Sequence, residues 1–523
     1  MNQVRTQNCE IETPSSAACS PLFPKSYLGT EREEPVFFRD LYLDQIVAAI
    51  TKGREQYDLL PFFYTPLADQ DAITLRHQVF RDLENEELLG HISRFSRRLA
   101  TMRACLVQSE KLRHEYQSRA WFLDAVEVYC SAVSELNDRL GACELQSNVL
   151  VTFRRWLADY LRSSSFVALA SETASVKAEL HHVQYCVLIR GGGFKVRKYD
   201  GETDYSSEVE AVFRKFKQGD VKGYLSTFSE RPEMNHIEGK ILDFVALLYS
   251  DEFACLDAYC ARHKNYLDET IKIFDREIQF YLAYLEHATA FARVGLHFCY
   301  PEITQQKGDI YSRDAFDLAL AWKLLGEKAA VVCNDFDLQG GERVLIVTGP
   351  NQGGKTTFAR MFGQLHYLAR LGCPVPGTAA RLFLSDNVFT HFEREEDIET
   401  RRGKLEDDLV RVREILDHLT ASSIIVVNEA FTSTTVADAL YLSTHVLERL
   451  CNHDALCVWV TFLDELASLN EKTVSMVAMV EPDNPAGRTF KVVRRPADGL
   501  AYAMALAEKY RLTYDRLKER LQP

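Results

Sequence analysis

The sequence predicts a multidomain protein in which a long α-helical region is followed by an α/β domain. A chain of 523 residues is longer than one ordinary domain of ~150 residues, so it has room for more than one core. Between residues 36 and 330, apolar side chains recur at helical spacing and glycine is sparse. From about residue 331, short β-branched runs alternate with helical periodicity, which is typical of a largely parallel sheet.

Two features subdivide the chain before residue 331. Residues 1–35 contain several prolines and serines, which predicts a mobile N-terminal tail. The helical region, residues 36–330, has long helices with few breakers, and therefore suits a core with a lever arm better than a compact enzyme core. Within it, the segment 183–199 predicts a β-hairpin, because two apolar runs flank the turn at Gly191–Gly193.

Residues 331–523 form the predicted α/β domain. Its strands are expected at compact apolar runs, several of which precede a helical pattern. Runs that are apolar throughout are typical of strands buried in a parallel sheet. The runs are Val344–Val347, Ile424–Val427, Ala455–Thr461, Val474–Val480 and Phe490–Val493.

Charge and cysteine content exclude several classes of protein. Lysine and arginine number 61 against 75 acidic residues, and the net charge of -14 excludes a polycation that coats nucleic acid, although a local basic patch remains open. The 13 cysteines show no metal-ligand spacing, which indicates reduced thiols. No stretch reaches the ~18 apolar residues of a membrane span. We therefore expect a cytoplasmic protein without a membrane partner.

The strongest motif in the sequence is a phosphate-binding loop. Gly349, Gly354 and the pair Lys355-Thr356 satisfy its spacing, after an apolar strand and before an amphipathic helix. Glycines let main-chain N–H groups turn toward phosphate oxygens, and the lysine is expected to reach the β- and γ-phosphates. The Thr356 hydroxyl is expected to hold Mg²⁺. The residues expected to bind the nucleotide are Gly349, Pro350, Asn351, Gln352, Gly353, Gly354, Lys355, Thr356 and Thr357.

A phosphate-binding loop of this kind needs an acidic partner at the end of a neighbouring strand. The run Ser423–Val427 ends in Asn428 and Glu429, so Glu429 is the candidate carboxylate that polarises the attacking water. Asn428 stands where such sites normally carry aspartate. Its amide can accept a hydrogen bond from a metal-bound water but brings no negative charge, which predicts weakened magnesium binding.

The residues around these motifs resemble a known family. The stretch VVCNDFDLQGGERVLIVTGPNQGGKTTFARM at 331–361 and the block NEAFTSTTVADAL at 428–440 are similar to the ATPase domain of MutS-type DNA mismatch-repair proteins. The resemblance covers about residues 330–510. It implies an ABC-type P-loop ATPase with ATP and Mg²⁺ as cofactors, in which hydrolysis is coupled to rearrangement of a dimer and its lever arms on DNA.

The chain departs from the family pattern in ways that bear on activity. Asn428 replaces the family's aspartate, which implies slow hydrolysis, and Phe462 replaces a histidine after the threonine. Core-like helices begin near residue 40, so we expect no mismatch-reading N-terminal domain before them. If DNA is bound, we expect recognition of its structure rather than of mismatches.

The resemblance also implies a homodimer. In such ATPases a signature segment of one subunit completes the other subunit's nucleotide site. Here Gly403 and Lys404 occupy that place, with Gly403 where the family has serine. A helical stripe begins close to Gly403, so exposed N–H groups and the basic stretch 401–404 could meet a γ-phosphate in trans. A solvated basic helix start is an equally good interpretation.

Two other functions remain open from the sequence. The first is a nucleotide-gated structural or interaction module with little hydrolysis and no DNA binding, which Asn428 and Phe462 favour and Glu429 opposes. The second is a P-loop kinase or other phosphotransferase, although about 300 residues of helical region suit mechanical coupling better.

Overall fold

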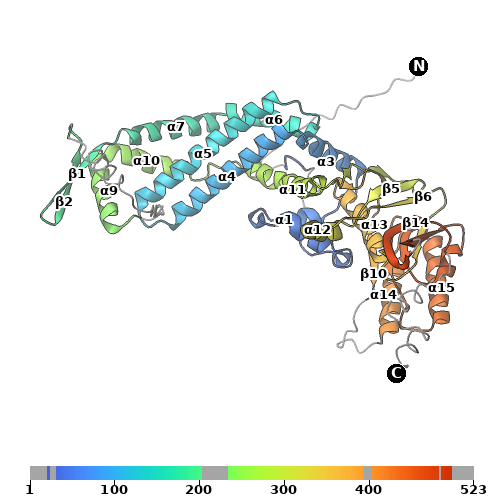
Figure 1. The fold of residues 1–523 in the computed structure, drawn as a ribbon. Helices are drawn as coiled ribbons and strands as arrows, with labels where there is room; N and C mark the ends of the chain where they lie inside the picture. The colour runs from blue at the N-terminus through green and yellow to red at the C-terminus, as the bar shows by residue number, and fades with distance from the viewer. Residues whose placement is uncertain (1–19, 24–30, 203–233, 394–402, 482–483, 498–523) are drawn as a thin grey trace, which may run out of the picture. The chain divides into compact units, whose positions relative to one another are not determined.

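A computed structural model describes residues 20–23, 31–202, 234–393, 403–481 and 484–497 (Figure 1). Most of the predicted N-terminal tail, the signature residues 401–402 and the segment from residue 498 onwards lie outside the described residues. Within the tail, Leu22 and Phe23 are described and are 2% exposed each. Phe23 packs against Phe62 and Tyr281, so this part of the predicted tail is anchored in a core.

The described chain is helical in its N-terminal half and contains α-helices, short 3-10 helices and mixed β-sheets. The helices are η2 (Val36–Phe38), α1 (Leu43–Thr51), η3 (Glu55–Tyr57), α2 (Leu60–Tyr64), α3 (Gln70–Leu83), α4 (Glu86–Lys111), α5 (Glu115–Ala142), α6 (Asn148–Arg162), α7 (Ser164–His181), α9 (His236–Leu248), α10 (Ser250–Arg262), α11 (Glu269–Ala292), α12 (Leu318–Glu327), α13 (Lys355–Arg370), α14 (Lys404–His418), α15 (Val436–Asn452) and η4 (Asp464–Ser468). The strands are β1 (Tyr185–Arg190), β2 (Gly193–Lys198), β3 (Phe298–Cys299), β4 (Glu302–Thr304), β5 (Ile310–Ala315), β6 (Asn334–Leu338), β7 (Val344–Thr348), β8 (Val375–Pro376), β9 (Ala379–Phe383), β10 (Val388–Phe392), β11 (Ile424–Asn428), β12 (Leu456–Val460), β13 (Thr473–Glu481) and β14 (Asn484–Arg494).

The chain divides into two compact units. The first unit comprises the described residues of Met1–Pro21, Leu83–Leu145 and Leu150–Asp275. The second comprises the described residues of Leu22–Asp82, Gln146–Val149 and Arg276–Pro523. The predicted division of the chain at residue 330 stays a prediction, and the sheets of the second unit draw strands from both sides of that residue.

The first unit is built around two long helices, α4 and α5, which lie side by side (Figure 1). Their buried apolar residues alternate in steps of three and four, the spacing that keeps one stripe of a helix facing its partner. Asn85 begins α4 by accepting hydrogen bonds from the main-chain N–H groups of Glu87 and Leu88. The buried stripe residues are Leu88, Ile92, Phe95, Leu99 and Met102 on α4, and Val126, Tyr129, Val133, Leu136 and Leu140 on α5.

A β-hairpin stands at residues 185–198, inside the segment predicted for it. Strands β1 and β2 are antiparallel, with Tyr185 opposite Lys198 and Arg190 opposite Gly193. Gly191 and Gly192 have φ values of 55° and 84°, which glycine adopts at no steric cost. Strand β2 contacts helix α9 (Figure 1).

The main sheet of the second unit carries the candidate site. Its strand order is β10-β11-β12-β7-β13-β14, in which β14 alone runs antiparallel to its neighbour. All five predicted strand runs form strands of this sheet. Strands β7, β11 and β12 are buried along their whole length, as expected for the centre of a parallel sheet.

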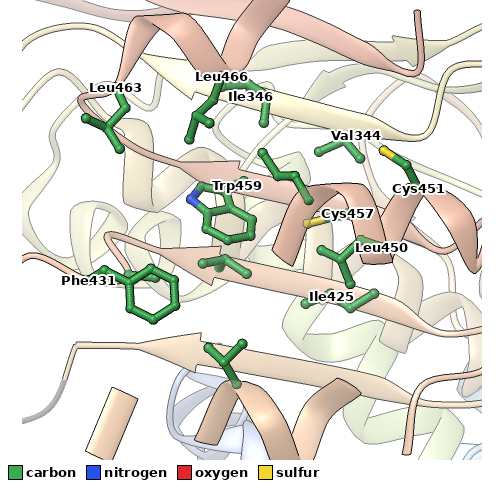
Figure 2. Close-up of a cluster of buried hydrophobic side chains, with 14 of the residues drawn as sticks. Val344, Ile346, Ile425, Phe431, Leu450, Cys451, Cys457, Trp459, Leu463 and Leu466 are labelled. Atoms are coloured by element: carbon green, nitrogen blue, oxygen red, sulfur yellow. The ribbon is translucent and has the colours of Figure 1, made fainter. Parts of the chain in front are cut away.

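One face of this sheet packs on α15 and η4 through a cluster of buried apolar side chains. Figure 2 shows Trp459 of β12 near the centre of the cluster, and this side chain is 1% exposed. Helix α13 contacts β11 and β12. A Cβ at Gly363 of α13 would lie 2.8 Å from Leu41 and 3.3 Å from Val426, so glycine allows the helix to approach closely.

A second, four-stranded sheet has the order β4-β9-β5-β6. Strand β6 leads into β7 of the main sheet after a short turn, so the two sheets are joined at the start of β7. The cysteines in the described parts of the chain are all free thiols, in agreement with the prediction from their spacing. None of the helices described here is long and apolar enough to cross a membrane.

Candidate nucleotide-binding site

The predicted phosphate-binding loop connects β7 to α13 at the carboxyl end of the main sheet. Gly349 and Gly354 have φ values of 116° and 94°, which side chains other than glycine rarely adopt. A Cβ at Gly349 would lie 2.8 Å from the carbonyl oxygen of Ala478, and one at Gly353 would lie 2.9 Å from that of Pro350. The glycines of the motif are therefore required by backbone conformation and by close approach.

Lys355 is the first residue of α13 and is only 5% exposed. Its ammonium group donates to three loop oxygens: the carbonyls of Gly349 at 2.9 Å and Pro350 at 3.2 Å, and Oδ1 of Asn351 at 3.3 Å. Burial lowers the pKa of Lys355, the Glu429 carboxylate opposes this effect, and the Arg488 guanidinium adds to it. The loop thus holds a buried cation, and phosphate oxygens could replace the carbonyls as its hydrogen-bond acceptors.

Thr356 and Asn428, the two predicted metal residues, lie in direct contact. The Thr356 hydroxyl donates a hydrogen bond of 2.8 Å to Oδ1 of Asn428. The strand order explains the contact: Asn428 is the last residue of β11, opposite Val460 of β12, and Val460 lies opposite Val347 of β7. These strands therefore end at the same edge of the sheet, where α13 begins.

Glu429 follows β11 directly and turns the chain out of the sheet. Its main-chain N–H donates to the carbonyl of Val460 at 3.0 Å. Its φ is 56°, in the left-handed region that is sparsely populated by residues other than glycine, asparagine and aspartate. Such a conformation costs about 1–3 kcal/mol and is common at functional sites. Because Glu429 directly follows Asn428, whose side chain contacts Thr356, it lies near the same loop.

The other predicted residues differ in exposure. Asn351 and Gln352 are exposed, whereas Pro350 and Gly353 are buried. Phe462, which stands in place of a histidine, is 51% exposed. The preceding Thr461 is buried and donates its main-chain N–H to the carbonyl of Val347.

Gly403 and Lys404, the predicted trans residues, form the start of α14. Gly403 is its N-cap with no side-chain cap, and a Cβ there would meet no atom within 4 Å. Lys404 forms an ion pair with Glu393, the residue after β10, and Thr432 also donates to that carboxylate at 3.5 Å. No local motif predicts Glu393 as the partner of Lys404, because the pairing depends on how α14 packs beside β10.

Sequence reasoning also missed the contribution of the β13–β14 hairpin. Arg488 of β14 donates through Nε to the carbonyl of Asn351 at 3.1 Å. Ala478 of β13 lies against Gly349 and Gly353. These residues are more than 120 positions from the loop in sequence, so no local sequence motif predicts their contact with it. Among the described residues, no cluster of three or more histidine, cysteine, aspartate or glutamate side chains could hold a metal ion.

The fold and this site define a class of protein. Residues 345–509 match the family MutS domain V, which begins in β7 and includes the loop, Asn428 and Glu429. Over this C-terminal part, which is less than half of its length, the chain is similar to the MutS family.

Several curated proteins are similar to part of the chain. A DNA mismatch repair protein MutS of Orientia tsutsugamushi (strain Boryong) is 27% identical over 237 residues, which are 43% of this chain and 26% of that protein. An Endonuclease MutS2 of Gemmatimonas aurantiaca is 30% identical over 207 residues, or 38% of this chain and 25% of that protein. The similarity therefore spans about a quarter of the length of these relatives.

Proposed function

We propose that this protein is a cytoplasmic P-loop ATPase of the ABC type that acts on DNA as a homodimer. The observation that carries the proposal is the glycine loop after β7, in which the Lys355 ammonium is buried among three loop oxygens. We propose DNA as the partner because the similar proteins are named for DNA mismatch repair and as an endonuclease. Residues 36–330 would act as core and lever, and residues 331–523 as the ATPase domain.

The loop residues have a common role in this proposal. Residues 349–357 bind the phosphates through main-chain N–H groups and through Lys355, and the N-terminus of α13 adds its dipole. A phosphate group that replaces the carbonyls of Gly349 and Pro350 would give the Lys355 ammonium a negatively charged acceptor in place of a neutral one, which strengthens its hydrogen bonds. The site residues therefore fit a nucleoside triphosphate.

The residues at the proposed metal position fit magnesium less fully. The Thr356 hydroxyl and the Asn428 amide offer the oxygen atoms that magnesium prefers, but both groups are neutral. Magnesium, when bound, would neutralise charge on the β- and γ-phosphate oxygens. Thr356 would hold the ion, and Asn428 would keep the Thr356 hydroxyl in place or accept a hydrogen bond from a bound water.

Glu429 would position and polarise the water that attacks the γ-phosphate. The hydrogen bond from its main-chain N–H to Val460 and its left-handed backbone conformation determine the direction in which the Glu429 side chain leaves the backbone. Gly403 and Lys404 of one subunit would face the phosphate of the other subunit. For that contact Lys404 must exchange Glu393 for the phosphate, and a surface ion pair of about 0–1 kcal/mol permits the exchange.

ATP turnover, measured without DNA and with duplex, mismatched or branched DNA, tests the proposal. We expect measurable magnesium-dependent turnover that at least one form of DNA stimulates. Branched DNA should act more strongly than a mismatched duplex if the protein recognises DNA structure.

The alternative is a nucleotide-gated interaction module, which the neutral Asn428 favours. It predicts ATP binding with near-zero turnover that no DNA changes. That result would exclude the DNA-dependent ATPase, while loss of binding in a Lys355 variant would still support the loop assignment.

A further inference from the structure

Arg488 brings a second cation to the glycine loop from a distant part of the sequence. It lies on β14, where the pairing with β13 joins Ala478 to Val492 and Val480 to Arg488. A step of two residues on β13 thus matches a step of four on β14, so β14 bulges at this end of the sheet. Bulges of this kind redirect side chains, and this one directs Arg488 to the loop.

Hydrogen bonds fix the shape of this bulge. Phe490, at its centre, has a φ of 57°, and its carbonyl accepts from Nδ2 of Asn334 at 3.1 Å. Oδ1 of the same Asn334 side chain accepts from the main-chain N–H of Val492 at 2.8 Å. A Cβ at Gly354 would lie 3.5 Å from the Phe490 carbonyl oxygen, so the bulge is in contact with the loop. The backbone of the bulge therefore sets how Arg488 approaches.

Two cations meet at one residue of the loop, Asn351. Nε of Arg488 donates to the Asn351 carbonyl at 3.1 Å, and the Lys355 ammonium donates to its side-chain Oδ1 at 3.3 Å. The two positive charges are thus close enough to act on one bound group.

We infer that Arg488 is a second phosphate-binding cation of the nucleotide site, and that it reduces the dependence of triphosphate binding on magnesium. The inference rests on the proposed function, since it concerns the same loop. A guanidinium group presents several donors in a plane and suits phosphate oxygens well. In related sites an aspartate stands at the position of Asn428 and helps to bind magnesium, which brings positive charge to the phosphates. Here Arg488 would supply part of that positive charge.

The charge balance of the site gives the physical reason. A bound triphosphate needs positive charge near its β- and γ-oxygens, from a metal ion or from side chains. Asn428 is neutral, so the protein attracts magnesium less than an aspartate would. Lys355 and Arg488 attract the phosphates without requiring the metal.

The experiment compares binding of a fluorescent ATP analogue in excess magnesium and in excess chelator. The variants are Arg488→Gln, which removes the charge, Arg488→Lys, which retains it, and Lys323→Ala as control. Lys323 is exposed on α12, outside both the loop and the bulge. Lys355→Ala reports separately on the proposed function, and thermal melting shows whether each variant is folded.

We expect the wild type to bind the analogue without magnesium, within about tenfold of its affinity with magnesium. Arg488→Gln should weaken metal-free binding roughly tenfold, and binding with magnesium about twofold at most. Arg488→Lys should recover most of the loss, and Lys323→Ala should match the wild type.

Two results would overturn the role of Arg488: a wild type that binds only with magnesium, or an Arg488→Gln variant weakened equally in both conditions or in neither. Either result leaves the loop assignment intact if Lys355→Ala still loses binding. Unchanged binding in Lys355→Ala would instead reject the proposed function itself.

Discussion

Replacing Asn428 by aspartate tests how the site holds magnesium. In the structure Oδ1 of Asn428 accepts a 2.8 Å hydrogen bond from Thr356, and the residue is 9% exposed. A carboxylate in the same place keeps this bond and adds a negative charge near the metal position. We therefore expect Asn428→Asp to lower the magnesium concentration at half-maximal turnover and to raise turnover.

The magnitude follows from the charge and its burial. Two unit charges about 4 Å apart attract by about 4 kcal/mol at an effective dielectric constant of about 20. Burying a carboxylate close to Glu429 costs several kcal/mol, which offsets most of this attraction. A net gain of about 1.4 kcal/mol corresponds to a roughly tenfold lower half-saturating magnesium concentration.

Magnesium titration of ATP turnover measures the effect. Asn387→Asp is the matched control, because Asn387 is exposed and precedes β10 at the opposite edge of the sheet, where the same charge should change nothing. Half-saturation at an equal or higher magnesium concentration in Asn428→Asp would refute the metal-support role. Asn428 would then act by orienting Glu429.

Two further substitutions test the catalytic carboxylate and the shape of the loop. Glu429→Gln should stop hydrolysis while the loop still binds ATP, so light scattering should show a persistent ATP-bound dimer, and a strictly monomeric ATP-bound variant would contradict the trans site. Gly349→Ala should destabilise the second unit by about 2–4 kcal/mol and weaken nucleotide binding, because its φ of 116° and a Cβ 2.8 Å from Ala478 both oppose a side chain. Gly341→Ala, with no atom near the added Cβ, is the control in thermal melting, and equal melting of the two variants would refute the loop geometry.

The main sheet could be predicted because its signals are local. Strands β7, β11 and β12 are continuous apolar runs, and the loop motif fits within a few residues after β7. The contact between Thr356 and Asn428 follows once both are placed at the carboxyl end of a parallel sheet.

The rest of the site depends on tertiary structure. The strands of the second sheet are short and partly exposed, so no continuous apolar run in the sequence predicts them. Strands β4 and β9 also pair across more than 70 residues. Arg488 reaches the loop only because β14 bulges, and the bulge depends on Asn334, more than 150 residues earlier. The pairing of Lys404 with Glu393 arises in the same way, from the packing of α14 beside β10.

The central claim is that the loop after β7 binds a nucleoside triphosphate through Lys355. Equilibrium binding of a fluorescent ATP analogue to wild type and Lys355→Ala tests it directly, with Lys323→Ala, an exposed lysine on α12, as control. Circular dichroism of each variant confirms that the fold is kept. We predict that Lys355→Ala loses at least 100-fold in affinity, since a charge-assisted contact of about 3 kcal/mol or more is removed from a buried site. Unchanged affinity in Lys355→Ala would contradict the account.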